Sequence, residues 1–274
     1  SYDIRGGLGE TLAEAVARRI GAAFAHVMRP GRVVVGHDAR ETSPALKAAL
    51  AEGLMAAGAD VADIGLCGTE EVYFATGHLG AGGGIMVTAS HNPIDYNGMK
   101  LVGPDSRPID PGTELAEIRR VAEEGAWSEE GRRGRIEAAD TRAAYVERVA
   151  GFANSPGLET VSIVANAGNG TAGAAFDAVA AALEARGVRL RITRVHHEPD
   201  PGFPNGIPNP LLPENRAATA EAVVAAGADL GLAWDGDFDR CFFFDETGAF
   251  IDGEYVVALL AQAMLAVEPG ARIV

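Results

Sequence analysis

The chain has 274 residues, of which 47% are hydrophobic and only 6% aromatic, and its formal net charge is −15 at pH 7. This length suits two domains of ordinary size, and apolar bulk made mostly of alanine and valine favours helices packed closely on sheets. The acidic balance argues against a nucleic-acid surface, because backbone phosphates are bound by clustered Lys and Arg. A small anionic substrate stays possible, since its site needs only a few local cations and backbone N–H groups.

The first half of the chain alternates helical and strand patterns. A helix is predicted over residues 11–27, a buried strand over 32–38, and a helix over 43–57 with Ser43 as N-cap. Strand VADIG, a short helix near 72–77 and strand GIMVTAS over 84–90 follow. This alternation predicts parallel pairing with right-handed crossovers. Ligands of such sheets gather beyond the carboxyl ends of the strands, so Asp38 and Ser90 should lie on the same edge.

A second α/β unit is predicted after residues 108–134, a charged, helical and glycine-containing segment that we interpret as a connector. The unit comprises a helix over 141–152, strand VSIVANA, a helix over 171–185, strand VRLRITRV, a Pro/Asn/Gly-rich loop over 198–213, a helix over 214–226, and strands ADLGLAW and CFFFD around the segment DGDFDR. An amphipathic helix over 254–266 and the segment ARIV, which resembles half of a buried strand, end the chain.

The predicted fold class is therefore α/β, with mixed, mostly parallel sheets sandwiched by helices. We expect two consecutive α/β domains over residues 1–138 and 139–247. Residues 248–274 would begin a truncated third domain, and the first residue is Ser1 rather than Met. We therefore expect a fragment that is truncated at both ends.

The cysteines and the hydropathy pattern bear on the cellular compartment of the protein. Cys67 and Cys241 lie far apart and in no metal-ligand spacing, which indicates neither a disulfide framework nor a zinc site. No stretch approaches the roughly 20 apolar residues of a membrane span, and no charged leader precedes the first motif. We expect a soluble, cytoplasmic chain that contacts no membrane.

Three carboxylates alternate along DGDFDR, so a turn can aim Asp235, Asp237 and Asp239 at one hard cation. Carboxylates that converge between buried strands repel one another unless a cation neutralises them, which argues against a merely solvated acidic turn. An EF-hand is the rival interpretation, with Glu246 at its twelfth position. The sixth position of an EF-hand loop requires Gly, but here it is Arg240. The segments that flank DGDFDR are also β-like, whereas an EF-hand loop is flanked by helices.

TASHNP places Ser90 at the end of an apolar strand, with His91 beside it and a turn-forming Asn-Pro after it. A hydroxyl there is exposed on the ligand edge of the sheet. A serine hydrolase is poorly supported, because the pattern G-x-S-x-G is absent. In YNGMK, the dipeptide Asn97–Gly98 predicts a hairpin turn that would bring Lys100 back toward Ser90.

The segment GNGTAG, from Gly168 to Gly173, follows a strand and opens a helix, as a dinucleotide-binding fingerprint does. Glu198 comes roughly 20 to 30 residues later, near where a ribose-binding acid would lie. A domain of an NAD- or NADP-dependent oxidoreductase is thus the alternative function. We prefer a tight turn that needs small residues, because the oxidoreductase leaves TASHNP and DGDFDR without a role.

YDIRG, TASHNP, YNGMK, PNPLLPEN and DGDFDR occur in the order and approximate spacing of the α-D-phosphohexomutases. The chain resembles the bacterial phosphomannomutase/phosphoglucomutase members of that family over nearly its whole length. One departure follows strand VADIG, where the family often has Thr-Pro and this chain has Thr69 and Glu70, which we interpret as a local loop change. The family has four domains, and we expect the third and fourth, which grip the sugar and the distal phosphate, to be missing here.

The resemblance implies that Ser90 is a phosphoserine. It would donate its phosphoryl group to a hexose phosphate, giving a hexose 1,6-bisphosphate, and recover a phosphoryl group after this intermediate turns around. Mg²⁺ would be bound by Asp235, Asp237, Asp239 and one oxygen of the Ser90 phosphate. Phosphoryl transfer needs in-line positioning and neutralised charge, which a divalent ion with Arg and Lys supplies.

Further site residues follow from the same resemblance. The implied catalytic residues besides Ser90 are Arg5, His91 and Lys100, and the candidate residues for binding substrate or phosphate are Tyr2, Arg40 and Arg240. Lys100 or Arg5 would handle the proton of the sugar hydroxyl, and lysine suits this better because its pKa can fall near cations. The fragment would be weakly active or inactive, and neither the choice between glucose and mannose nor the oligomeric state is readable. A binding module with a purely structural metal loop is a third hypothesis.

Overall fold

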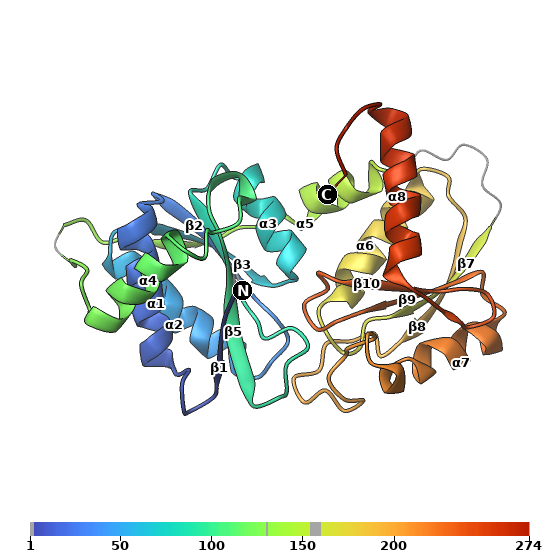
Figure 1. Ribbon diagram of the computed structural model, residues 1–274, viewed down its shortest axis with the longest axis horizontal. Coiled ribbons are helices and arrows are strands. Elements are labelled where there is room, and N and C mark those ends of the chain that lie inside the picture. The colour runs from blue at the N-terminus through green and yellow to red at the C-terminus, as the bar shows by residue number, and fades with distance from the viewer. Residues whose placement is uncertain (1–2, 130, 154–159, 274) are drawn as a thin grey trace.

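The computed structural model describes residues 3–129, 131–153 and 160–273. Two α/β units lie side by side, the first coloured blue to green and the second yellow to orange in Figure 1. The strand order is β1-β5-β4-β2-β3-β6 in the first sheet and β11-β10-β9-β7-β8 in the second. Among the described residues, the first sheet has three parallel and two antiparallel strand pairs. The second sheet has two of each, so the predicted mixed sheets are confirmed, but only the first is mostly parallel.

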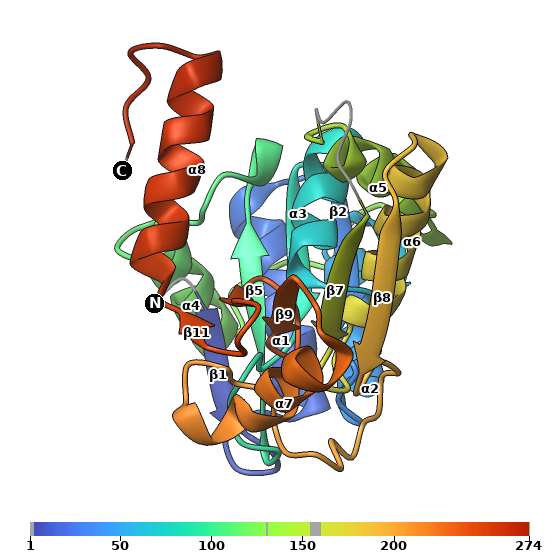
Figure 2. The same ribbon diagram turned by 90° about the vertical axis from the view of Figure 1, so that its right-hand side faces the viewer.

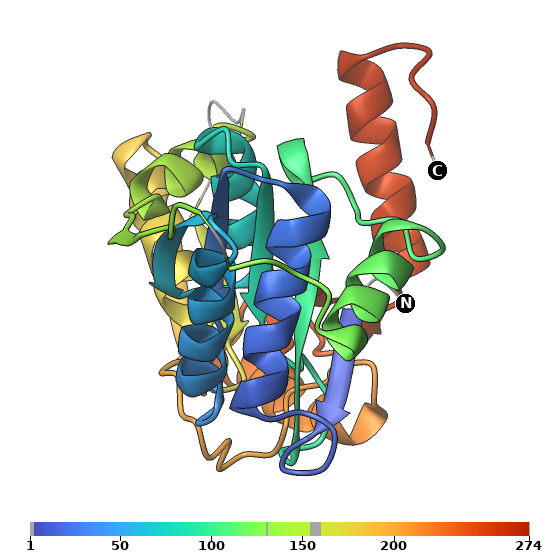
Figure 3. The same ribbon diagram turned by 90° about the vertical axis from the view of Figure 1, so that its left-hand side faces the viewer.

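The first unit has helices on both faces of its sheet. Its elements are β1 (Asp3–Gly7), α1 (Glu14–Met28), β2 (Arg32–His37), α2 (Ser43–Ala56), β3 (Asp60–Leu66), α3 (Thr69–His78), β4 (Gly83–Val87), β5 (Tyr96–Val102), the 3₁₀ helix η1 (Pro104–Ser106), α4 (Glu114–Glu124) and β6 (Ile136–Ala138). Helices α1, α2 and α4 cover the face that is turned to the viewer in Figure 3, and α3 covers the other.

The run of three valines in β2 follows from this double cover. Val33 and Val35 belong to the core under α1 and α2, whereas Val34 belongs to the smaller core under α3. All three are fully buried. Successive side chains of a strand point to opposite faces, so a strand covered on both sides is apolar throughout instead of alternating.

Residues 108–134 are not the connector that the sequence predicted. Ile118 and Val121 on α4, together with Ile109 before it, lie in the main core of the first unit. Residues 136–138 then form β6, which pairs with β3 at the edge of the sheet. The charged outer face of the helix masked the narrow apolar stripe that packs on α1.

Two local predictions also need correction. Asn97–Gly98 is no turn but part of β5, where Gly98 pairs with Arg5 of β1 and a Cβ would lie 2.1 Å from the Ile4 carbonyl oxygen. The chain turns in residues 88–95 instead, and antiparallel pairing still brings Lys100 back, opposite Met86. Ser43 is the first residue of α2 rather than its N-cap, and Thr42 precedes the helix.

The second unit continues the pattern on a smaller sheet. Its elements are α5 (Arg142–Ala150), β7 (Val161–Asn166), α6 (Ala172–Ala185), β8 (Leu190–Val195), the 3₁₀ helix η2 (Pro213–Asn215), α7 (Ala217–Ala226), β9 (Leu230–Trp234), β10 (Cys241–Phe244) and β11 (Phe250–Ile251). In Figure 2, α5 and α6 lie on one side of this sheet and α7 on the other. Because β11 pairs with β10, the sheet continues past the boundary predicted at residue 247.

The predicted helix near the end of the chain is α8 (Gly253–Val267), which stands away from both sheets in Figures 2 and 3. None of its residues is buried, and its exposed apolar side chains include Tyr255, Leu259 and Val267. The strand expected at ARIV is not present in residues 271–273, which have no regular structure. In the described part of the chain, no helix has the length and apolarity to cross a membrane.

Candidate active site

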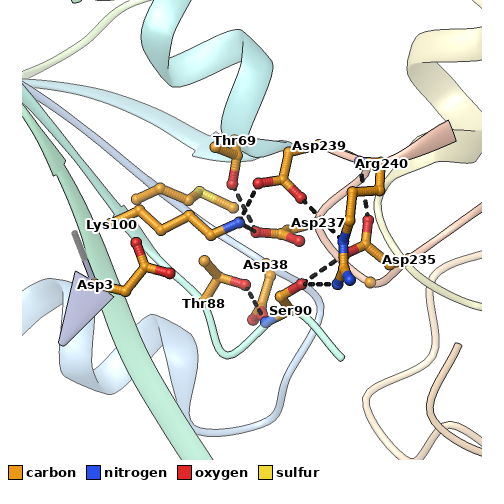
Figure 4. A network of polar contacts seen from close by, with 12 residues as sticks. Asp3, Asp38, Thr69, Thr88, Ser90, Lys100, Asp235, Asp237, Asp239 and Arg240 are labelled. Carbon is orange, nitrogen blue, oxygen red and sulfur yellow. Dashed lines mark hydrogen bonds and ion pairs between the residues drawn. The ribbon is translucent and has the colours of Figure 1, made fainter. Parts of the chain in front are cut away.

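The predicted ligand edge of the first sheet faces the loop between β9 and β10 of the second unit. Asp38 and Ser90 follow neighbouring parallel strands, β2 and β4, and lie together as predicted, because the carboxyl ends of parallel strands meet at one edge. The Asp38 N–H donates to the Val87 carbonyl at 3.0 Å. Figure 4 shows Ser90 directed at the three aspartates, which come from the second unit.

Ser90 contacts the acidic loop directly. Its hydroxyl donates a hydrogen bond to Asp235 Oδ2 at 2.6 Å and accepts one from Arg240 Nη2 at 2.9 Å. The Ser90 N–H donates to Thr88 Oγ1 at 2.8 Å, and the backbone has φ of 50°. A residue other than glycine is uncommon in this left-handed region, and such strain is typical of functional sites. The turn thus holds the hydroxyl toward the second unit.

Asp235, Asp237 and Asp239 converge as the sequence predicted. One carboxylate oxygen of each lies within 4.8 Å of the others, and Asp235 and Asp237 are fully buried. Among the described residues, the buried atom Asp237 Oδ1 has no hydrogen-bond partner, which is costly unless the atom binds a ligand. Burial and then the charge of Asp237 raise the pKa of Asp235 to about 6. These oxygens fit a hard divalent cation. The flanking β9 and β10 exclude an EF-hand, which needs helices there.

Lys100 lies on the opposite side of the aspartates from Arg240. Its Nζ donates to Asp237 Oδ2 at 2.6 Å and to Asp239 Oδ2 at 2.5 Å. Burial acts to lower the pKa of Lys100, but the charges of Asp237 and Asp239 outweigh it and raise the pKa to about 12. Lys100 is therefore protonated in this arrangement, and the lowered lysine pKa that the sequence argument invoked does not apply to it here.

The other predicted cations lie around the serine. Arg240 Nε donates to Asp235 Oδ2 at 2.9 Å, and Arg240 also contacts His91 Nδ1. Burial and then the neighbouring Arg240 lower the pKa of His91. Arg5 donates to the Thr88 carbonyl at 2.9 Å. A cleft of about 520 Å³ is lined by Arg5, His91 and Arg240 together with Ser90, Lys100, Asp3, Tyr73, Asn92, Leu101, Val102, Ser106, Pro108 and Asp239.

Arg40 lies beneath the serine turn and not in this cleft. It is 2% exposed, and its guanidinium donates to the carbonyls of Ser90, Asn92, Pro93 and Tyr96 at 3.0, 2.6, 2.9 and 3.1 Å. This burial argues against the predicted role of Arg40 in binding substrate or phosphate in the cleft, because its Nη1 and Nη2 atoms already donate to backbone carbonyls. Among the described residues its Nε has no hydrogen-bond partner, and it lies 3.5 Å from Asp38 Oδ2. A further candidate for binding substrate or phosphate, Tyr2, lies outside the described residues.

Threonines that support the site were missed by the sequence analysis. Thr69 donates its hydroxyl hydrogen to Asp237 Oδ2 at 2.7 Å, and Thr171 donates to the Gly236 carbonyl from both its N–H, at 3.1 Å, and its hydroxyl, at 3.2 Å. A signal for Thr69 existed, because it follows β3 just as Ser90 follows β4 and the same edge rule applies. The sequence pattern at Thr69 and Glu70 had indicated only a local loop change.

The glycines of GNGTAG make room for protein and not for a dinucleotide. A Cβ on Gly170 would lie 2.6 Å from the Gly236 carbonyl oxygen, and one on Gly173 would lie 2.2 Å from that of His197. Gly168 has φ of 58° and packs on Pro208. Chain segments therefore occupy the space that a pyrophosphate would need. The oxidoreductase alternative is not supported, and the preferred explanation, a tight turn, agrees with this packing.

Two family models match the chain. The phosphoglucomutase/phosphomannomutase alpha/beta/alpha domain I covers residues 1–129, and domain II of the same family covers residues 143–248. The chain belongs to the phosphoglucomutase/phosphomannomutase family. Each matched segment carries one half of the site, since Ser90 lies in the first segment and the three aspartates lie in the second.

Curated relatives agree with this family assignment. A phosphomannomutase from Escherichia coli is 53% identical over 276 residues, which is 100% of this chain and 61% of that protein. A protein from Xanthomonas campestris pv. campestris named among phosphohexose mutases is 55% identical over 275 residues, with 100% and 60% covered. The chain therefore spans about 60% of the length of these relatives.

Solved structures of the family share the fold. A phosphoglucomutase/phosphomannomutase family protein from Burkholderia thailandensis superposes with a TM-score of 0.89 at 34% identity, over 99% of this chain and 59% of that one. A phosphoglucomutase from Paramecium, in its open form, gives 0.62 at 16% identity, over 95% and 54%. The second likeness concerns the fold alone.

Proposed function

We propose that this chain carries the phosphoryl donor and the metal site of a phosphohexomutase, which interconverts hexose 1-phosphate and hexose 6-phosphate through a hexose 1,6-bisphosphate. The observation that carries the proposal is the 2.6 Å hydrogen bond from the Ser90 hydroxyl to Asp235 Oδ2, which joins the two motifs across the units. The names of relatives such as the E. coli phosphomannomutase support this substrate class.

The metal ligands in this proposal are Asp235, Asp237, Asp239 and an oxygen of phosphorylated Ser90. The oxygen-only donor set and the unpartnered Asp237 Oδ1 fit Mg²⁺. When bound, the ion would neutralise charge on the phosphoryl group during transfer.

Arg240 and Ser90 take part in the transfer itself. The bond between phosphorus and Ser90 Oγ breaks as a bond forms between phosphorus and the sugar hydroxyl oxygen, so negative charge collects on Ser90 Oγ. Arg240 Nη2, which lies 2.9 Å from that oxygen, donates a hydrogen bond to it throughout. His91 lies beside the same oxygen, with Nδ1 at 3.1 Å.

The proton of the sugar hydroxyl needs an acceptor in the cleft, and Lys100 and Arg5 both line it. Lys100 Nζ carries a proton while it contacts Asp237 and Asp239, so it is ready to donate to a departing sugar oxygen in the return direction. It must release that proton before it can act as the base in the forward direction.

The division of labour follows the proposed domains. The donor Ser90 belongs to the domain proposed over residues 1–138, and the aspartates belong to the second domain, proposed over residues 139–247. Because β11 (Phe250–Ile251) is still part of the second sheet, a third domain would begin after it rather than at 248. A cytoplasmic location belongs to the same proposal, and it is supported by Cys67 and Cys241, both of which are free thiols.

Phosphopeptide mass spectrometry tests the donor. Protein purified from cells and incubated with a hexose 1,6-bisphosphate should carry phosphate on the Ser90 peptide. Ser90→Ala should abolish both this phosphate and phosphoryl transfer. Ser106→Ala is the matched control, because Ser106 lines the same cleft but its hydroxyl donates to the Tyr73 carbonyl. Phosphoryl transfer that persists in Ser90→Ala, together with a wild-type protein whose Ser90 never carries phosphate, would contradict the proposal.

A further inference from the structure

The start of α3 in the first unit contacts the acidic loop of the second unit through one residue. Thr69 is fully buried, and its N–H donates to the Asp237 carbonyl at 3.0 Å. Its hydroxyl donates to Asp237 Oδ2 of the same residue at 2.7 Å, as Figure 4 shows. Thr69 therefore holds both the backbone and the side chain of a proposed metal ligand that belongs to the other unit.

These contacts leave the two oxygens of Asp237 unequal. Oδ2 accepts from Thr69 Oγ1 and from Lys100 Nζ, whereas Oδ1 is buried and has no hydrogen-bond partner in the part of the chain that the structure describes. Lys100 reaches Oδ2 at the end of a flexible stem and is shared with Asp239. Thr69 is β-branched and stiff at χ1, so it is the contact that sets the rotation of this carboxylate.

The backbone around this contact has no room to shift. A Cβ on Gly68 would lie 2.1 Å from the ring of Phe238, the residue that follows Asp237. Phe238 has φ of 45° and is 8% exposed, in a cluster with Ala167, Ala172 and Ala175 of its own unit. The acidic loop is therefore packed between its own core and the start of α3, which fixes the register of Thr69 against Asp237.

We propose that Thr69 is a positioning residue for the metal site, which keeps Asp237 Oδ1 free as the ligand and makes metal affinity depend on the contact between the two units. This proposal rests on the assignment of Asp235, Asp237 and Asp239 as metal ligands in the proposed function. Outer-shell partners of metal ligands typically contribute about 10- to 100-fold to metal affinity. Removal of the Thr69 hydroxyl should weaken binding by about that factor.

Mn²⁺ binding to the whole chain, followed by the electron paramagnetic resonance signal of the free ion, tests this without measuring turnover. Thr69→Val keeps the shape and the backbone N–H but loses the hydroxyl, and it should weaken affinity by about 10- to 100-fold. Thr69→Ser restores the hydroxyl and should recover most of the affinity. Thr76→Val is the matched control, because Thr76 is equally buried on α3 but its hydroxyl donates to the Val72 carbonyl of its own helix.

The outcomes separate this proposal from the one it rests on. Mn²⁺ binding that is equal in wild type and Thr69→Val overturns the role of Thr69 and leaves the metal site standing. No Mn²⁺ binding by the wild type overturns the metal assignment and this inference with it. Circular dichroism without metal checks the fold of each variant, and if Thr69→Val does not fold, Thr69→Ala against Thr69→Ser makes the same comparison.

Discussion

At the scale of single residues, Arg40 shows how a buried charge organises a catalytic turn. A guanidinium that is taken out of water is costly unless its donors are satisfied. The carbonyls of the serine turn accept from Nη1 and Nη2 of Arg40, whereas Nε has no hydrogen-bond partner among the described residues and lies 3.5 Å from the counter-charge, Asp38 Oδ2. The ring of Phe203, from the second unit, lies 5.8 Å from the Arg40 guanidinium carbon. Arg40 therefore shapes the turn that presents Ser90 and does not meet the ligand.

We expect Arg40→Lys to loosen this turn. The variant keeps the positive charge but not the planar fork that reaches several carbonyls at once. Amide hydrogen exchange in residues 90–96 should become faster, while exchange in β2 and β4 stays slow. Arg135→Lys, a change at an exposed arginine, is the control. Unchanged protection of residues 90–96 in Arg40→Lys would contradict the role given to Arg40.

Asp38 should make stability depend on pH. Burial, opposed by hydrogen bonds from Ser43 and Thr88, raises the pKa of Asp38 above its ordinary value. The folded state therefore binds this proton more tightly than the unfolded chain does. The stability that Asp38 contributes is fully present below its unfolded pKa of about 3.9, and it is lost as the pH rises through the folded pKa. We expect the difference in free energy of unfolding between wild type and Asp38→Asn to fall from pH ~4 upward. Urea unfolding at several pH values measures it, and a constant difference would refute the argument.

At the scale of elements, the start of α3 packs too closely on the acidic loop to accept any side chain at Gly68. We expect Gly68→Ala to cost about 1–3 kcal/mol, as overpacking does, and to weaken metal binding through the displaced Phe238. Gly77→Ala on the same helix is the matched control, because a Cβ there meets nothing within 4 Å. That change should be neutral or stabilise by up to about 1 kcal/mol. Urea unfolding measures the free energy of unfolding of both variants. Equal stability of Gly68→Ala and Gly77→Ala would contradict the packing argument.

Helix α8 presents the opposite case, an apolar element without cover. Leu259 is 66% exposed, whereas Leu50 in the main core is fully buried. We expect Leu259→Ser to change the free energy of unfolding by no more than about 0.5 kcal/mol. Leu50→Ala should cost about 2–5 kcal/mol. A large loss in Leu259→Ser would mean that α8 packs on the rest of the chain after all.

At the scale of the whole molecule, the site exists only where the two units meet. The contact extends beyond Thr69, since Glu71 of α3 forms an ion pair with Arg142 of α5 and Phe74 packs edge-on against Tyr145 at 5.7 Å between ring centres. Each unit also has a core of its own. We therefore expect metal to strengthen an assembly that folds without it.

Chelation and metal addition test this expectation. Mg²⁺ at about 100 times its dissociation constant should raise the free energy of unfolding by about 2.7 kcal/mol. EDTA should return it to the metal-free value without loss of the far-ultraviolet circular dichroism signal. Loss of that signal in EDTA would instead favour the hypothesis that the metal loop is purely structural.

The main elements and motifs were predictable because their signals are local. Val33 to Val35 indicate a strand covered on both faces, the polar residues that end β2 and β4 indicate a ligand edge, and the alternation of Asp235, Asp237 and Asp239 indicates a cation site. Each depends on side-chain period or on the chemistry of a few adjacent residues. Such signals can be recognised without knowledge of the fold.

The role of each cation and each glycine depends instead on contacts between distant parts of the chain. Arg40 and Arg240 are both arginines beside a site motif, yet one holds backbone carbonyls in the interior and the other reaches the Ser90 hydroxyl. Gly98 resembles a turn residue but lies in a strand because β1 passes against it. Thr69 contacts Asp237 from 168 positions away along the chain. No local pattern encodes such contacts, because they arise only when separate elements pack together and fill one another's hydrogen-bonding needs and space.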